Sequence, residues 1–196
     1  MKEENKTAAI WAGVFLILYM LPFALFLPMN LRDRPLDGGV WLMLGQVLIP
    51  VVSGLFLILR KPVFSAILMT VLAIVTMISA VPQLREFLET GQYCATYDET
   101  IGYAEYLPMR FIVLPVLSIA TSILFAAMLY TRGWISLLLA ILIAAAEIAY
   151  AVFELQSMGY VTGHPTPFNL MLPFNYIASA LCTGLYLLSL GRGGKE

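Results

Sequence analysis

Charged residues are scarce in this chain. Of its 196 residues, 12% are Asp, Glu, Lys or Arg, against roughly 25% in an ordinary soluble domain. Apolar residues make up 61%, and the mean hydropathy is +0.88. So few charges cannot cover the surface of a water-soluble core, and so much apolar sequence excludes a disordered chain. The composition therefore predicts a polytopic membrane protein.

Positive charge, cysteine and histidine are also in short supply. Eleven basic and twelve acidic residues give a net charge of -1, so we expect no basic surface for nucleic acid. The cysteines Cys94 and Cys182 lie far apart, and His164 stands in a proline-rich loop. No group of these residues has metal-ligand spacing, so no metal site is predicted. Cys182, inside an apolar run, is expected to be a small packing residue.

Catalytic motifs are missing from the sequence as well. There is no HExxH, GxSxG or Walker A motif, and no pair of acids inside an apolar run. No His or Lys lies at the depth of the intramembrane Ser and Thr residues, where it could act as a base. We therefore expect that the chain is not an enzyme. Turnover of a labelled lipid by the purified protein would favour the opposite hypothesis.

Six apolar stretches are long enough to cross a bilayer, which takes about 20 residues in a helix. We predict an all-α fold, a single domain over 1–196 with six transmembrane helices. The approximate spans are 8–28, 40–59, 62–82, 111–130, 134–153 and 168–190. The first stretch is too long for the h-region of a signal peptide and has no A-x-A site after it, so we expect a retained helix.

The distribution of Lys and Arg predicts the orientation, since cytoplasmic loops carry the excess of positive charge. With the N-terminus inside, seven of the eleven basic residues are cytoplasmic and four are outside. The inner turns at 60–61 and 131–133 are very short, so the helices that they join must be antiparallel neighbours. We expect both termini in the cytoplasm, in a multi-pass protein of the plasma membrane.

The longest connection is the outer loop over 83–110. Its first part, 82–91, has Pro at its start, Gly at its end and apolar residues on one face, which predicts a short interfacial helix on the bilayer surface. Four tyrosines interleaved with acids follow, either as a lid that receives a cation or partner, or as an interfacial aromatic belt. Arg110 and Glu154 should lie level at the outer helix ends and form a structural ion pair.

Glu147 is the single acid deep inside a predicted span. A charged carboxylate at mid-bilayer costs about 2.5–3.5 kcal/mol on insertion scales, so such residues usually face the bundle interior. Ser136, Ala140, Ala144 and Ala151 recur with it at three- and four-residue spacing, a small-residue face suited to close packing. We expect this face to pack on Ser118, Ser122 and Ala126 of the preceding span. A neutral, protonated Glu147 is the alternative to an ionised one.

Polar side chains from five predicted spans lie at one depth, in the outer half of the membrane. Glu147 is about six residues, or roughly 9 Å, below its outer helix end, and prolines that free backbone carbonyls lie close to the same depth. Two interpretations stay open: a ligand pocket open to the outside, or a hydrogen-bonded network that holds the helices together. The candidate ligand-binding residues are Glu147, Gln46, Asn175, Ser118, Tyr150 and Thr76.

Two functions are compatible with this pattern. The first is a small membrane protein that binds or transports a small solute or ion, with Glu147 accepting a cation, an amine or a proton. Its size, six spans and orientation resemble the substrate-binding subunits of energy-coupling vitamin transporters. Ala8 and Ala12 resemble the small-xxx-small contact that such subunits offer to their partner. The resemblance covers topology and not residues.

The second function is a non-catalytic interaction subunit of assembly, sensor or immunity type, whose polar layer is structural. Its partner would be another membrane protein, contacted through the outer loop or the lipid-facing helices. The sequence leaves open the identity of the solute, of any cofactor and of the partner, and it does not separate a channel from a carrier.

Overall fold

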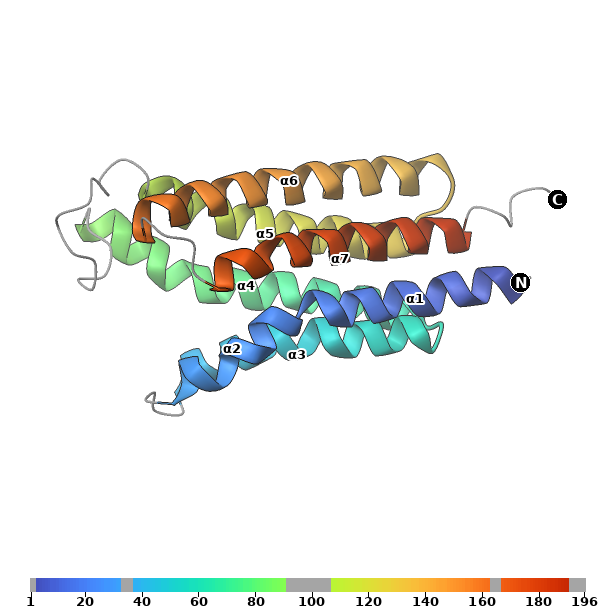
Figure 1. Ribbon diagram of the computed structural model, residues 1–196, viewed down its shortest axis with the longest axis horizontal. Coiled ribbons are helices and arrows are strands. Elements are labelled where there is room, and N and C mark those ends of the chain that lie inside the picture. Colours follow the sequence, from blue (N-terminus) through green and yellow to red (C-terminus); the bar gives the residue numbers. More distant parts are fainter. Residues whose placement is uncertain (1–2, 33–36, 91–106, 163–166, 191–196) are drawn as a thin grey trace.

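The computed structural model describes residues 3–32, 37–90, 107–162 and 167–190, and these residues form helices joined by short turns (Figure 1). Long apolar runs account for this all-helical content, and several helices continue through an internal proline: Pro28, Pro50, Pro82 and Pro115. The described helices are α1 (Glu3–Tyr19), α2 (Leu21–Leu31), α3 (Gly38–Ile58), α4 (Pro62–Thr90), α5 (Leu107–Tyr130), α6 (Trp134–Thr162) and α7 (Pro167–Leu190).

The helices form a closed ring in which each long helix packs on two others. From α1 the contacts pass to α3, α4, α5, α6 and α7, and α7 returns to α1. The outer half of the first predicted span is a separate helix, α2, which touches α1, α3 and α7. The beginning of α1, the end of α7, and the α3–α4 and α5–α6 turns all lie at one end of the bundle (Figure 1). We call it the turn end.

Both turns at this end use a left-handed backbone to reverse the chain sharply. Arg60 has a φ of 58° and Gly133 a φ of 68°. The Lys61 N–H donates to the Phe56 carbonyl at 2.8 Å, which closes the last turn of α3 in a Schellman arrangement. Such tight closure makes α3 and α4, and likewise α5 and α6, antiparallel neighbours, as the sequence predicts.

The outer surface of the bundle is apolar. On α4 the exposed side chains recur every three or four residues along the whole helix, with Val63, Ile67, Val71, Ile74 and Ile78 each 39–50% exposed. A soluble protein rarely exposes a continuous apolar face of this length. Three helical segments of the described chain are long and apolar enough to cross a membrane: Gly38–Ile58, Pro62–Pro82 and Trp134–Val152.

Helix ends differ from the prediction mainly on the side away from the turn end. The predicted span 8–28 is broken at Met20, because Pro22 lies at the start of α2 and has no N–H to continue the ladder of α1. The segment 82–90 is the last part of α4, continuous through Pro82, and not a separate interfacial helix. α6 likewise continues to Thr162, beyond the predicted end at 153.

The core on the turn-end side is filled by apolar side chains that point into the ring. Those at 1% exposure or less include Ala12, Ala66, Met128 and Ile143, and the Cys182 thiol is buried among them without a disulfide. The expected packing role of Cys182 fits this position. Within a bilayer, such side chains stabilise the fold through close van der Waals packing between helices.

α1 and α3 cross with their backbones in direct contact. A Cβ at Gly13 would lie 2.5 Å from the Gly54 carbonyl oxygen, and a Cβ at Gly54 would lie 2.7 Å from the Gly13 carbonyl oxygen. Ala12, beside this crossing, is 0% exposed. Ala12 and Gly13 of α1 therefore pack inside this chain, whereas Ala8 is half-buried. Small-residue spacing alone does not show which neighbour it faces.

Two buried serines join α3 to α4 close to the turn end. The Ser53 and Ser65 hydroxyl oxygens lie 2.5 Å apart, and Ser53 also donates to the Ser65 carbonyl at 3.3 Å. Both residues are 0% exposed, so the Ser65 hydroxyl depends on Ser53 for a partner, whereas Ser53 also has the Ser65 carbonyl. On the opposite side of the ring, Ser136 and Tyr186 donate to the carbonyls of Met128 and Leu129.

Replacing Ser53 by alanine should lower the free energy of unfolding by about 1 kcal/mol, because the buried Ser65 hydroxyl loses its partner. Ser65→Ala should lower it less, because Ser53 still donates to the backbone carbonyl of residue 65. The double variant should lose less than the sum of the two, since no unpaired hydroxyl is left. A double-mutant cycle on the detergent-solubilised protein, measured by reversible unfolding, checks this. Strictly additive losses would show that the two hydroxyls do not interact.

Candidate functional site

Glu147 lies inside the bundle, as its position on α6 predicts. The residue is 8% exposed, and its Oε1 accepts a hydrogen bond from the Ser179 hydroxyl of α7 at 3.0 Å. Ser136 and Ala140 are buried on the same side of α6. Ala144 is exposed and Ile143 takes the inward position, so the predicted small-residue face is correct in part.

α7 places a second polar side chain one turn from Ser179. Asn175 is 3% exposed, and its Oδ1 has no hydrogen-bond partner among the described residues. Residues four apart on a helix lie on the same face, so Asn175 and Ser179 line the same side of α7. A buried acceptor without a donor costs about 1–3 kcal/mol, a cost that native proteins usually avoid. This oxygen is therefore available to a donor from a ligand.

Three tyrosines surround the outer side of Glu147. Tyr150 lies one turn farther along α6, and its ring is 6.2 Å from the ring of Tyr176 on α7, tilted by 55°. The Tyr19 hydroxyl interacts electrostatically with the Glu147 carboxyl and with the Tyr150 and Tyr176 hydroxyls. α1, α6 and α7 thus converge on one carboxylate with aromatic side chains. We call Tyr19, Glu147, Tyr150, Asn175, Tyr176 and Ser179 the Glu147 cluster.

The α1–α2 break lies at this cluster. Tyr19 is the last residue of α1, and the Met20 N–H bonds to the Ile17 carbonyl at 3.0 Å, which tightens the last turn. Pro22 has no N–H with which to reach the carbonyl of Leu18. α1 therefore ends at Tyr19, and α2 begins two residues later at Leu21.

Two of the predicted site residues belong to another contact. Gln46 of α3 donates through Nε2 to the Ser79 hydroxyl at 2.8 Å, and Ser79 donates to the Thr76 carbonyl at 2.8 Å. This group fixes α3 to α4 on a different side of the ring. Ser118 is half-buried on α5, where its carbonyl accepts from Ser122. Helical spacing places Tyr150 one turn from Glu147 on α6 and Asn175 one turn from Ser179 on α7. Gln46 and Thr76 belong instead to the α3–α4 contact, and Ser118 to a hydrogen bond within α5.

No positive side chain pairs with Glu147 within the described part of the chain. The single ion pair there joins Arg85 and Glu89 at 2.7 Å on the exposed end of α4. The described residues also contain no group of three His, Cys, Asp or Glu that could hold a metal ion. The Arg110–Glu154 pair, Cys94, His164 and the tyrosines between 93 and 106 fall on side chains or segments outside the described residues.

Tyr19, Tyr176 and Ser179 are functional candidates that sequence reasoning missed. Ser179 follows Asn175 by four residues, so helical spacing placed it on the same face. Tyr176 adjoins Asn175 in the chain. Tyr19 gave no comparable signal, because its place beside Glu147 depends on which helices are neighbours in the ring.

Comparison of the chain with protein-family models, with curated proteins and with solved structures found no match. The Glu147 cluster is therefore the basis for a function.

Proposed function

We propose that this chain is a multi-pass protein of the cell membrane that binds or transports a small solute or ion through a polar pocket in the outer half of the bilayer. The observation that carries the proposal is the buried Glu147 carboxyl, whose described neighbours are neutral polar and aromatic groups. Ionisable residues inside a membrane are expensive and mark ligand or ion pathways. The unpaired Asn175 oxygen, one turn away, has the same implication.

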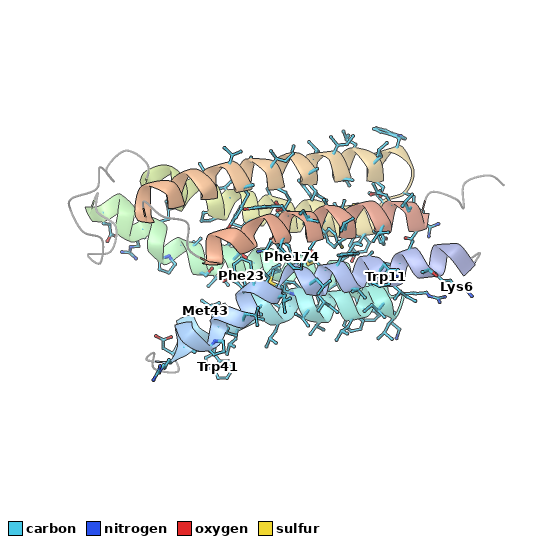
Figure 2. The ribbon with its side chains drawn as sticks, viewed as in Figure 1. Lys6, Trp11, Phe23, Trp41, Met43 and Phe174 are labelled. Carbon is cyan, nitrogen blue, oxygen red and sulfur yellow. The ribbon has the colours of Figure 1, made fainter. Side chains whose placement is uncertain are left out.

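Six crossings with both termini inside are supported by the side chains at the two ends of the bundle. Lys6, Arg60, Lys61 and Arg132 lie at the turn end, which the positive-inside rule assigns to the cytoplasm. Trp134, 73% exposed, stands at the same end, while Trp41, 65% exposed, lies near the start of α3. Figure 2 shows Trp11 toward the turn end and Trp41 toward the other. Along α3, Trp41 is about 26 Å from the turn, close to the hydrocarbon thickness of a bilayer.

The broken first span also favours solute handling. Discontinuous helices in transporters place helix ends at the substrate or ion, near the middle of the membrane. The α1 end at Tyr19 and the Glu147 carboxyl lie together at such a depth, since Glu147 is about 20 Å along α6 from the turn end.

The test is a native mass spectrum of the gently solubilised protein and of Glu147→Gln. We expect the natural protein to carry a bound small molecule. At least nine-tenths of the Glu147→Gln molecules should lack it, because the charge that holds it is gone. Ser136→Ala is the matched control, since Ser136 is 1% exposed on the same helix and donates one hydrogen bond. This control should keep the molecule.

The Gln46–Ser79–Thr76 group favours the alternative, a non-catalytic interaction subunit, because polar groups at the same depth there satisfy one another. In that case the spectrum would show a bare chain or a chain carrying another polypeptide, with no difference between the natural protein and Glu147→Gln. That result would overturn the solute proposal.

A further inference from the structure

The geometry points to a primary ammonium group as the part of the ligand that the Glu147 cluster binds. This inference rests on the proposed solute function and narrows it to one class, small organic amines in their protonated form. It follows from three features of the cluster: its charge, its hydrogen-bond acceptors and its aromatic side chains.

The charge of the cluster is negative and lacks a counter-charge among the described residues. Glu147, when ionised, supplies a carboxylate that has no ion-pair partner in the described part of the chain. The described Lys and Arg residues lie in the turns or near helix ends. A buried charge is stable when it is paired and hydrogen-bonded. A cationic ligand would provide that pair, whereas an anion or a neutral solute would leave the carboxylate without one.

The acceptors of the cluster require a ligand that carries N–H groups. Glu147 has two carboxylate oxygens with room for about four hydrogen bonds, and Ser179 donates to Oε1. Asn175 adds an oxygen with no described donor, 3% exposed and on the same face of α7 as Ser179. An ammonium with three N–H donors can bond to both side chains at once. A quaternary ammonium has the charge but no N–H, so the Asn175 oxygen would stay unpaired.

The aromatic side chains favour an organic cation over a metal ion. Tyr150 and Tyr176 are in ring contact beside the carboxylate, and the Tyr19 hydroxyl lies within electrostatic range of all three groups. Aromatic rings attract ammonium groups through their negative faces and pack on the carbon atoms attached to them. Alkali and alkaline-earth ions bind to oxygen atoms and make few contacts with aromatic rings. Calcium, for example, takes six or more oxygen ligands.

The experiment compares matched probes on the full-length protein in lipid nanodiscs at neutral pH. The benzyl series consists of benzylammonium, benzyltrimethylammonium, benzyl alcohol and benzoate, which share a carbon skeleton and differ in charge and N–H groups. An ethyl series, from ethylammonium to ethanol and acetate, tests a smaller pocket. Sodium and potassium chloride are added separately, with ionic strength held constant. The readout is the midpoint of thermal unfolding against probe concentration, which reports binding to the folded state.

We expect stabilisation by a primary ammonium of at least one series, and none by its quaternary, neutral or anionic counterpart. Glu147→Gln should weaken the apparent affinity on the order of 10- to 100-fold, the effect of losing a charged hydrogen-bond partner. The control Ser136→Ala should respond as the natural protein does.

Other outcomes overturn the inference and separate it from the proposed function. Stabilisation by an alcohol, a carboxylate, a quaternary ammonium or an alkali ion alone, lost in Glu147→Gln, would retain the solute site and reject the primary ammonium. No response to any probe, in a protein that native mass spectrometry shows bare or bound to a polypeptide, would reject both.

Discussion

Replacing Gly13 by alanine should destabilise the protein by about 3 kcal/mol, the upper part of the range for overpacking in a tight core. The added methyl group would lie 2.5 Å from the Gly54 carbonyl oxygen and 2.7 Å from the Cγ1 atom of Ile58. The first of these atoms belongs to the backbone, so it cannot move aside by a change of rotamer. α1 and α3 would have to separate along their crossing.

Gly184→Ala is the matched control for this variant. Gly184 lies inside α7, and a Cβ there meets no atom within 4 Å. An alanine at that position should raise stability by roughly 0.5–1 kcal/mol, because it restricts the unfolded chain and costs no space. Thermal unfolding of both variants in the same detergent gives the comparison. Equal and small effects would mean that α1 and α3 do not cross in backbone contact.

The Gly13 variant should also weaken ligand binding. Tyr19 follows Gly13 by six residues, or about 9 Å along α1, and ends the helix beside Glu147. A displacement of α1 away from α3 would therefore move the Tyr19 hydroxyl relative to the cluster. The two parts of the structure are coupled because the same helix supplies the close crossing and one wall of the site.

Helix ends at the turn end were predictable from the sequence, because strong local signals mark them. The predicted starts at 62 and 134 coincide with α4 and α6, and the predicted span 40–59 differs from α3 by two residues at one end and one at the other. At the opposite end of the bundle, Asp37 caps α3 by accepting from the Val40 N–H at 3.0 Å. Prolines inside apolar runs gave weaker signals. Pro22 ends one helix, whereas α4 continues through Pro82, and hydropathy does not distinguish the two cases.

The expected distance of Glu147 from its outer helix end was wrong, because α6 continues to Thr162, beyond the predicted end at 153. Counting at about 1.5 Å per residue from the turn end places Gln46, Thr76, Glu147 and Asn175 at a similar level, but it does not give their direction around the ring. Whether two of them meet depends on which helices are neighbours. The short turns make α3 and α4 neighbours, and likewise α5 and α6. The contacts of α7 with α1 and α6 arise instead from the closure of the ring. This is why Gln46 and Thr76 were assigned to the same site as Glu147 although they lie on another side.

Asn175→Leu should raise the stability of the ligand-free protein and abolish retention of the bound molecule. Leucine has the same number of side-chain heavy atoms as asparagine and the same branch at Cγ, but no polar atom, so the variant removes a buried oxygen that has no described partner. We expect a gain of about 1 kcal/mol in the free energy of unfolding. The ligand loses an acceptor at the same time, which should weaken its binding on the order of tenfold or more. Thermal unfolding without ligand and native mass spectrometry measure the two effects.

Gln46→Leu makes the same chemical change at a similar depth and should have the opposite effect on stability. The Gln46 amide donates to Ser79 at 2.8 Å, so its removal breaks a satisfied hydrogen bond between α3 and α4. Such bonds contribute roughly 0.6 kcal/mol on average within a bilayer, so stability should fall by about this amount while the bound molecule is retained. If both variants were destabilised and neither released a ligand, Asn175 would be a structural residue like Gln46. Opposite signs at the two amides would instead mean that the fold keeps the Asn175 oxygen unpaired at a cost in stability, as expected of a group that binds a ligand.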